Sequence, residues 1–310
     1  MRAVRQQRSE GSRPRPVGAP HLAAAFALLL AVVAWAGPGD AQLVPSAGTA
    51  PSQLGSEAAL VTSDSPWEVS LDGRIGLPRG YVKVGENEVH GTHLRLHQDL
   101  GIDVSGALEA GLSFHVTPRD AIRASYLYYF LDGGAGFSQP IAFNGETFGP
   151  GHVDTNTDFF RVSLDYERQL LKRDEVTLTG TVGLTYVYLD VTLTGQGRRS
   201  PEDFYRQELP VPILGLRADF PLGDRFGVRA FVAGGGIPPV DSLRKEGGTI
   251  YLSQAHADAG VSVTYRITRV LDAEAGYRLT YFFQHEKSHE DNNTFQLIDN
   301  GFQVGLRFRF

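Results

Sequence analysis

The stretch Gly301-Phe-Gln-Val-Gly-Leu-Arg-Phe-Arg-Phe310 closes the chain with a strict alternation of apolar residues and residues that are polar or small. Successive side chains of a β-strand point to opposite faces, so every second residue from Phe302 to Phe310 would form one apolar stripe. A soluble enzyme rarely ends on such a stripe, whereas a strand that faces lipid requires one. The pattern predicts a membrane-facing β-strand.

The same period of two recurs along most of the chain. The alternation begins at Trp67, and the residues before Trp67 are aperiodic. Ten segments show it: Trp67–Ile75, Leu108–Val116, Ile122–Phe130, Phe160–Tyr166, Val176–Tyr188, Leu214–Phe220, Phe226–Val232, Ala255–Tyr265, Leu271–Phe283 and Phe302–Phe310.

The connections between these segments alternate in length. Those near residues 117, 171, 222 and 268 are short, and those at 78–104, 132–156, 191–210, 236–250 and 284–296 are long and polar. Membrane barrels of the up-and-down type have short periplasmic turns and longer outer loops. We therefore predict an all-β fold, a transmembrane antiparallel up-and-down β-barrel with about ten strands. Twelve strands are possible if residues 78–104 form a further hairpin.

Charged residues occupy one face of the ten segments. The apolar faces contain no Asp, Glu, Lys or Arg, although the chain is 21% charged. A charge at the middle of a bilayer costs about 2–4 kcal/mol, so this absence is expected of lipid contact. A soluble antiparallel sandwich would also alternate, but it explains neither the loop lengths nor the terminal Phe310. Nine acids and nine arginines are expected to face the interior: Glu68, Asp72, Glu109, Asp165, Glu167, Asp219, Asp258, Asp272 and Glu274, with Arg74, Arg123, Arg161, Arg217, Arg229, Arg266, Arg278, Arg307 and Arg309.

Two stretches carry a resemblance to known proteins. The ending resembles the closing strand of Gram-negative outer-membrane β-barrels, and residues 91–103 are similar to a stretch of uncharacterised barrels of that kind. The resemblance covers most of residues 66–310. It implies location in the cell outer membrane, contact with outer-membrane lipids, and recognition by the barrel-assembly machinery through the C-terminal strand ending at Phe310. It indicates neither a ligand nor an oligomeric state.

The first 41 residues have the features of a secretory signal peptide. Five Arg precede the apolar run 22–36, which ends in Ala34-Trp35-Ala36. The sequence Gly39-Asp40-Ala41 follows shortly after it. Fifteen apolar residues are too few to span a bilayer comfortably, which disfavours an anchor helix. Residues 42–65 are small, Pro-containing and aperiodic, and we expect a flexible periplasmic leader there. The domain prediction is a signal peptide at 1–41, a leader at 42–65 and an outer-membrane barrel at 66–310.

Composition excludes several functions. Removal of residues 1–41 leaves 24 basic and 33 acidic side chains, and so acidic a chain is no nucleic-acid binder. The chain has no Cys, which excludes disulfides, thiol catalysis and Cys-ligated zinc.

The sharpest motif is His285-Glu286-Lys287-Ser288-His289, which matches the H-E-x-x-H pattern of zinc peptidases. That chemistry needs both His on one helix face and a third ligand. Here the motif follows strand-like residues and is expected in a polar loop of about a dozen residues. The helix that the zinc-peptidase site requires is therefore missing. We interpret it as a chance match, with adventitious metal binding at His285 and His289 left open.

Other polar groups invite a catalytic hypothesis. Omptin proteases and lipid A deacylases are outer-membrane barrels that use acidic, His or Ser residues, and His152, Asp154, His289 and Asp291 could be imagined in such roles. The chain does not align with their motifs, so we interpret these residues as solvated loop polars. We predict no enzyme, no cofactor, and no catalytic, cofactor-binding or metal-binding residue.

Two His residues are expected inside the barrel. His256 and His115 would face the lumen beside Asp258 and Glu109, where a pH-sensing role is conceivable. We favour membership of the internal charge network, because lumen groups must hydrogen-bond to something.

The expected interior limits the function. Eight strands are just filled by side chains and 16–18 leave an aqueous channel, so about ten should leave at most a narrow path. The prediction is a non-enzymatic barrel that contributes to envelope structure or presents surface loops to partners. The alternatives are a narrow solute channel and, less favoured, a hydrolase at the rim.

Overall fold

The computed structural model describes residues 66–86, 89–204, 210–241, 251–289 and 291–310. The signal peptide and leader predicted at 1–41 and 42–65 lie outside the described residues. Every regular element within the described ranges is a β-strand. None of these residues forms a helix long and apolar enough to cross a membrane.

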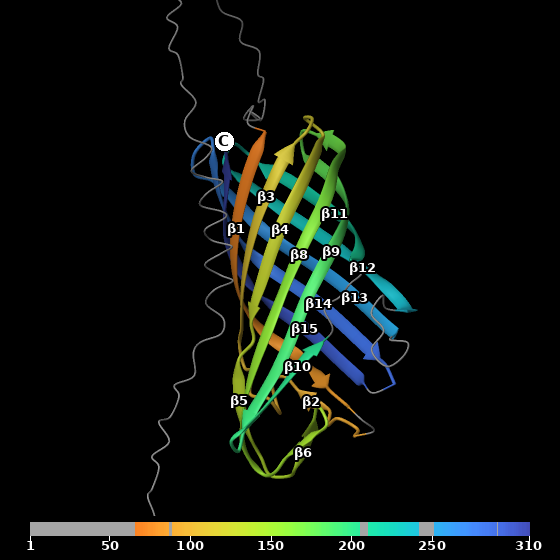
Figure 1. Cartoon of the computed structure of the whole chain (residues 1–310). Helices are drawn as coiled ribbons and strands as arrows, with labels where there is room; N and C mark the ends of the chain where they lie inside the picture. Colours follow the sequence, from red (N-terminus) through yellow and green to blue (C-terminus); the bar gives the residue numbers. More distant parts are fainter. Residues whose placement is uncertain (1–65, 87–88, 205–209, 242–250, 290) are drawn as a thin grey trace, which may run out of the picture. The chain divides into compact units, whose positions relative to one another are not determined.

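Ten long strands form a wall and five short strands lie in the connections (Figure 1). The wall strands are β1 (Trp67–Lys83), β3 (Ser105–His115), β4 (Asp120–Phe130), β8 (Gly151–Arg173), β9 (Val176–Gly195), β11 (Val211–Leu222), β12 (Phe226–Asp241), β13 (Tyr251–Arg266), β14 (Leu271–Lys287) and β15 (Asn292–Arg309). The short strands are β2 (Leu94–Arg95), β5 (Gly133–Phe137), β6 (Ile141–Phe143), β7 (Glu146–Phe148) and β10 (Arg198–Phe204).

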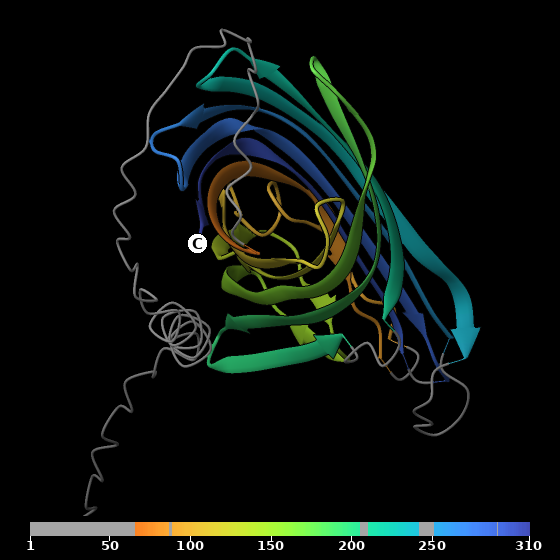
Figure 2. The same cartoon turned by 90° about the horizontal axis from the view of Figure 1, so that it is seen from above.

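The wall closes on itself. Each long strand pairs antiparallel with the next, and β15 pairs with both β14 and β1. Val304 of the last strand lies opposite Gly73 of the first and Ala275 of β14. Seen from above, the strands run around a lumen (Figure 2). The predicted ten-stranded antiparallel barrel is confirmed. Residues 78–104 form no further wall hairpin: residues 78–83 continue β1, and Leu94–Arg95 form β2, which pairs with the end of β1.

The two ends of the barrel differ. At the short-turn end, the connections at 116–119, 174–175, 223–225 and 267–270 are tight, and Gly223 adopts a φ of 83° that favours glycine. The opposite, long-loop end carries β2, β5, β6, β7 and β10 (Figure 1).

The outer face of the wall is apolar. Many of the residues expected to face lipid are exposed, and Phe302 and Ile75 keep 76% and 70% of their surface accessible. Tyr126, Phe160 and Tyr188 form a row across three strands towards the long-loop end, with ring centroids 5.6 and 4.9 Å apart. Aromatic residues at this height form the girdle that membrane barrels place at the lipid–water interface.

The strands are longer than the sequence predicted. Much of the segments 132–156, 191–210 and 284–296, expected as loops, continues β8, β9, β10, β14 and β15. These extensions keep the period of two but exchange its faces: Tyr186 and Tyr188 are the last aromatic residues on the outside of β9, and Leu189, Val191 and Leu193 point inward and are buried. An apolar stripe that moves from the outward to the inward face interrupts the alternation in the sequence. The sequence therefore predicts loops in those segments.

Candidate functional site

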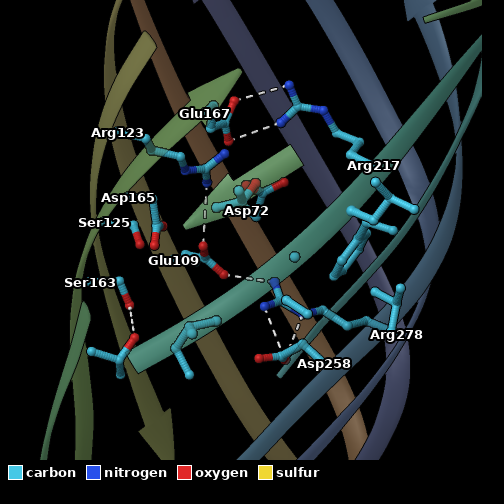
Figure 3. A pocket seen from close by; sticks show the side chains of 18 of the residues that line it. Asp72, Glu109, Arg123, Ser125, Ser163, Asp165, Glu167, Arg217, Asp258 and Arg278 are labelled. Carbon is cyan, nitrogen blue, oxygen red and sulfur yellow. Dashed lines mark hydrogen bonds and ion pairs between the residues drawn. The ribbon is translucent and has the colours of Figure 1, made fainter. Parts of the chain in front are cut away.

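The lumen contains all nine acids and nine arginines expected there, and most are joined in two ion-pair networks. We call the long-loop end the upper end of the barrel, although Figures 1 and 3 draw it at the bottom. The upper network centres on Arg278, whose Nη1 lies 2.7 Å from Glu109 and whose Nη2 lies 3.1 Å from Asp258 (Figure 3). Arg161 binds the same Asp258 at 2.8 Å, and Arg123 reaches Glu109 at 3.4 Å. Hydrogen bonds from guanidinium to carboxylate are among the strongest in proteins, so this network ties β3, β4, β8, β13 and β14 together across the barrel.

The lower network runs towards the short-turn end. Arg217 donates two hydrogen bonds to Glu167, at 3.0 Å each, and also contacts Asp219 at 3.2 Å. Arg229 lies 2.6 Å from Asp219 and 3.0 Å from Glu274. The network continues to the mouth through five further residues: Arg307, Glu68, Arg309, Asp272 and Arg266.

Two of the nine acids expected in the lumen stand outside both networks. Among the described residues, Asp72 and Asp165 have no ion pair within 4 Å, and both line the central cavity (Figure 3). Each lies over a glycine of the neighbouring strand, Asp72 over Gly305 and Asp165 over Gly183. A Cβ on either glycine would overlap the carboxylate. The glycines therefore make room for these two acids.

The networks leave only small spaces. The central cavity has a volume of about 170 Å³, and a second cavity of about 230 Å³ lies at the short-turn mouth. Arg229 and Arg307 line both cavities, so the lower network separates them. The central cavity is polar and large enough for several water molecules.

Beyond the two ion-pair networks the lumen is filled mainly by an apolar core, and we call it the apolar plug. The carboxylates of Asp299 and Glu286 are buried on the same inward strand faces. On β4 it begins after Arg123, and on β14 after Arg278, so it lies nearer the long-loop end. Its wall residues are Val82, Ala107, Leu127, Tyr129, Val153, Phe159, Val187, Leu189, Val191, Leu193, Phe282, Phe295 and Leu297. The connections contribute Val84, Leu94, Leu96, Leu100, Ile102, Leu131, Ile141, Phe143 and Phe148.

Specific contacts hold the plug together. Phe159 is at its centre, with ring centroids 5.2 Å from Tyr129, 5.0 Å from Phe282 and 6.3 Å from Phe295. Backbone bonds join the two inserted connections, because Thr92 N donates to the Ala142 carbonyl and Ala142 N donates to Thr92 Oγ1, both at 2.8 Å. The plug is a packed core and not a loose loop in a pore.

A salt bridge lies within the inserted loop that connects β1 and β3. Asp99 accepts hydrogen bonds from Arg95 Nε and Nη2 at 2.8 and 2.9 Å, and from the Arg95 amide at 2.8 Å. These bonds hold the pKa of Asp99 below its usual range. The pair fixes the turn that carries Leu96 and Leu100 into the plug.

A closed antiparallel wall with an apolar outside and a charged inside is the structure of proteins that cross a bilayer as β-strands. The chain is an outer-membrane β-barrel. No family model and no curated protein matches it. Solved structures that resemble it include the outer membrane protease OmpT from Escherichia coli (13% identity over 79% of this chain and 97% of that one, TM-score 0.47), the translocator domain of autotransporter NalP from Neisseria meningitidis (14%, 79% and 88%, TM-score 0.40) and Neisserial surface protein A (10%, 79% and 98%, TM-score 0.33). All are Gram-negative outer-membrane β-barrels.

The H-E-x-x-H motif of this outer-membrane barrel lies only partly in a loop: its first three residues end β14, and Ser288 and His289 are in the connection that follows. His285 and Glu286 are on β14, so they point to opposite faces, with Glu286 fully buried inside. His289 follows the strand and is exposed. The two His therefore do not share a helix face, as the zinc-peptidase mechanism requires. Within the described ranges, no group of three or more His, Asp or Glu side chains is placed to hold a metal ion.

The rim candidates fall into separate places. His152 Nε2 lies 3.1 Å from Asp154 on the exposed outside of β8. Asp291 accepts a hydrogen bond from Ser288 in the β14–β15 connection. Because β8 and β15 are not neighbours in the wall, the structure does not bring these groups into one site.

The two His expected beside lumen acids differ. His256 faces the lumen and is buried, but its Nε2 contacts Gln254 at 3.0 Å and its ring packs on Phe282. His115 lies exposed at the short-turn end. His256 therefore lines the central cavity together with Asp258, as expected. His115 has no described hydrogen bond or ion pair with Glu109, so its expected place beside that acid is not observed.

The apolar plug was missed by the sequence reasoning. The signal was present in the alternating residues Val187, Leu189, Val191 and Leu193, which continue the period of β9 on its inner face. An apolar inward stripe directly beyond an aromatic girdle is the feature that could have predicted it.

Proposed function

We propose that this protein is a non-enzymatic outer-membrane barrel with a sealed body, which stabilises the envelope and holds its outer connections in a fixed arrangement. The observation that carries the proposal is the apolar plug above the two ion-pair networks. A barrel that only had to conduct would gain nothing from a packed core in its outer half.

The plug argues against the alternative of a narrow solute channel. An ion or polar solute would have to leave water to cross it, and burial of an unpaired polar group in an apolar region costs several kcal/mol, about 2–7 by transfer measurements. Below it, every guanidinium of the upper and lower networks already has a carboxylate partner. Asp72 and Asp165 keep free coordination capacity in the central cavity, but the apolar plug lies between that cavity and the long-loop end.

The rim geometry supports a non-enzymatic role over a rim hydrolase. A general base must come within hydrogen-bond reach of the group it activates. The His152–Asp154 pair is exposed on the outside of β8, away from the β14–β15 connection that carries His289 and Asp291.

We also propose that the barrel-assembly machinery recognises the strand that ends at Phe310. The Phe310 amide donates to the Trp67 carbonyl at 3.1 Å, and its ring stacks on Phe308 at 5.5 Å. This residue therefore completes the seam between β15 and β1. Removal of Phe310 should reduce the amount of protein inserted in the outer membrane, and unchanged insertion would contradict this part of the proposal.

The test combines conductance and turnover. The barrel refolded without residues 1–41 is placed in a planar bilayer beside the Arg161→Ala and Arg229→Ala variants, and is assayed separately against lipid A and peptides. The proposal expects no stepwise conductance from the wild type and no turnover. Steps that change in the arginine variants would establish the channel, and turnover lost in His289→Ala or Asp291→Ala would establish the hydrolase.

A further inference from the structure

A long groove crosses the lipid-facing surface on the opposite side of the wall from the central cavity. Its volume is about 630 Å³, and it runs over β13, β14, β15, β1 and β3. Its outward-facing floor is made by the small residues Gly73, Ala273 and Ala275. A Cβ placed on Gly73 would meet nothing within 4 Å, so the groove is open at this point.

Larger side chains bound the groove. Val263, Tyr265, Val304 and Leu306 line it. Tyr277 and Phe302 pack edge to face beyond one end, 5.4 Å apart, and Phe308 and Phe310 stack beyond the other. All of these outward side chains are apolar or aromatic, so the occupant must be a hydrocarbon.

The groove lies in the half of the wall nearer the short-turn end, and a cation lies at its foot. Arg269 is exposed at the tip of the β13–β14 turn, four residues beyond Tyr265 and four before Ala273. Tyr265 and Ala273 pair opposite each other, and the strands end one residue beyond Tyr265 and two residues before Ala273, so Arg269 lies close to the foot of the groove. A lipid with an acyl chain in the groove would have its head group near Arg269.

The turn that carries Arg269 is well ordered by hydrogen bonds. The Ile267 amide donates to the Leu271 carbonyl at 2.9 Å. Thr268 Oγ1 accepts bonds from the Val270 and Leu271 amides at 3.3 and 3.1 Å. Arg269 is therefore presented from a fixed backbone.

We propose that the groove and Arg269 form a binding site for one phospholipid of the periplasmic leaflet, with an acyl chain across the Gly73–Ala275 floor and the phosphate at Arg269. The occupant is a lipid and not a second copy of this chain for two reasons. A stable protein interface uses about 20–30 residues on each side, whereas eleven residues line the groove. Charge complementarity also favours an anionic head group at Arg269.

The first test fills the groove. The barrel is reconstituted in phosphatidylcholine bilayers with a small fraction of spin-labelled phosphatidylglycerol, and the motionally restricted lipid is counted by electron paramagnetic resonance. Gly73→Phe and Ala275→Phe are compared with Ala259→Phe, an outward residue of β13 outside the groove. Heat-modifiable migration on a gel shows that each variant is folded.

The expected result is a loss of the preferentially bound phosphatidylglycerol in both groove variants and its retention in Ala259→Phe. Equal binding in all four proteins overturns the proposal. A dimer by native mass spectrometry that the groove variants dissociate also overturns it, because the occupant would then be a second copy.

The second test removes the charge. Arg269→Gln is compared with Arg173→Gln, an exposed cation at the β8–β9 turn, which has no part in the groove. The preference for phosphatidylglycerol over phosphatidylcholine should fall about fivefold in Arg269→Gln, the factor for about 1 kcal/mol per basic residue near an anionic surface. A fall of the same size in Arg173→Gln would mean that the rim attracts lipid without a site, and the proposal would be wrong.

Discussion

The guanidinium of Arg74 lies over the ring of Tyr129, 5.2 Å from its centroid, and this contact marks the plane where the lumen changes from charged to apolar. Below it, Arg74 Nη1 donates to Thr280 Oγ1 at 2.7 Å, and Thr280 Oγ1 donates to Asp258 at 2.7 Å. Above it, Tyr129 packs on Phe159 in the apolar plug. A cation over an aromatic ring is attracted to it, so this contact links the charged layer of the lumen to the apolar plug.

Arg278 holds the upper network together, and its loss should destabilise the barrel strongly. Arg278→Ala leaves Glu109 with only the 3.4 Å contact to Arg123 and removes one of two guanidiniums from Asp258. Removal of one partner of a buried ion pair costs about 3–5 kcal/mol. Equilibrium unfolding in urea from lipid vesicles measures it. Arg79→Ala, at an exposed position of β1, should change the free energy of unfolding by about 0.5 kcal/mol or less, and equal losses in the two variants would contradict the network.

Phe159 tests the apolar plug. Phe159→Ala removes contacts to three aromatic rings in a buried core and should lower the free energy of unfolding by about 3–5 kcal/mol. Phe302→Ala is the matched control, since Phe302 faces outward and is 76% exposed. It should cost less than Phe159→Ala, because lipid chains fill the space that the ring leaves and no buried cavity forms. If the plug were loosely packed, Phe159→Ala would lower the free energy of unfolding no more than Phe302→Ala does.

The glycine under Asp165 should be coupled to that acid. Gly183→Ala places a Cβ on the carboxylate and should cost about 1–3 kcal/mol as an overpacking change. In Gly183→Ala/Asp165→Ala the clash is gone, so the double-mutant cycle should show a coupling of about 1 kcal/mol or more. Gly73→Ala, where the added Cβ meets nothing, should be near neutral. Additive effects at 183 and 165 would show that the glycine has another purpose.

Asp99 gives the inserted loop a pH dependence. Its pKa is depressed by the bonds from Arg95, so its stabilising contribution is present above the unfolded value of about 3.9 and is lost as the pH falls through the lower folded pKa. Because Arg95 is half exposed, the contribution is modest, about 0.2–1 kcal/mol. Unfolding of the wild type and Asp99→Asn should differ by this amount at pH 7 and converge in acid. A difference that persists at the lowest pH would mean that charge is not the cause.

The membrane-spanning part of the fold could be predicted from the sequence because the bilayer imposes a simple rule there. Val304 and Leu216 must face outward and Arg278 and Glu167 inward, and the structure places all four as expected. Beyond the aromatic girdle the rule reverses, since water now lies outside and a core lies inside. Phe282, Phe295 and Leu297 follow this second rule.

The partners of each lumen charge could not be predicted. Alternation fixes the face of a side chain, but the pairing of Arg278 with Glu109, 169 positions away in the chain, depends on the tilt of the strands and the resulting register across the barrel. The groove over Gly73 and Ala275 has the same origin, because its residues come from five strands that meet only when the wall closes.

The seal of the lumen is tested most directly by cysteine accessibility, since the natural chain has no Cys. Ser125 lines the central cavity below the apolar plug, and Glu146 is exposed in a connection at the long-loop end. Whole cells carrying Ser125→Cys or Glu146→Cys are treated from outside with a membrane-impermeant maleimide. The account predicts rapid labelling of Glu146→Cys and none of Ser125→Cys. Labelling of Ser125→Cys at the rate of the exposed position would contradict a sealed barrel.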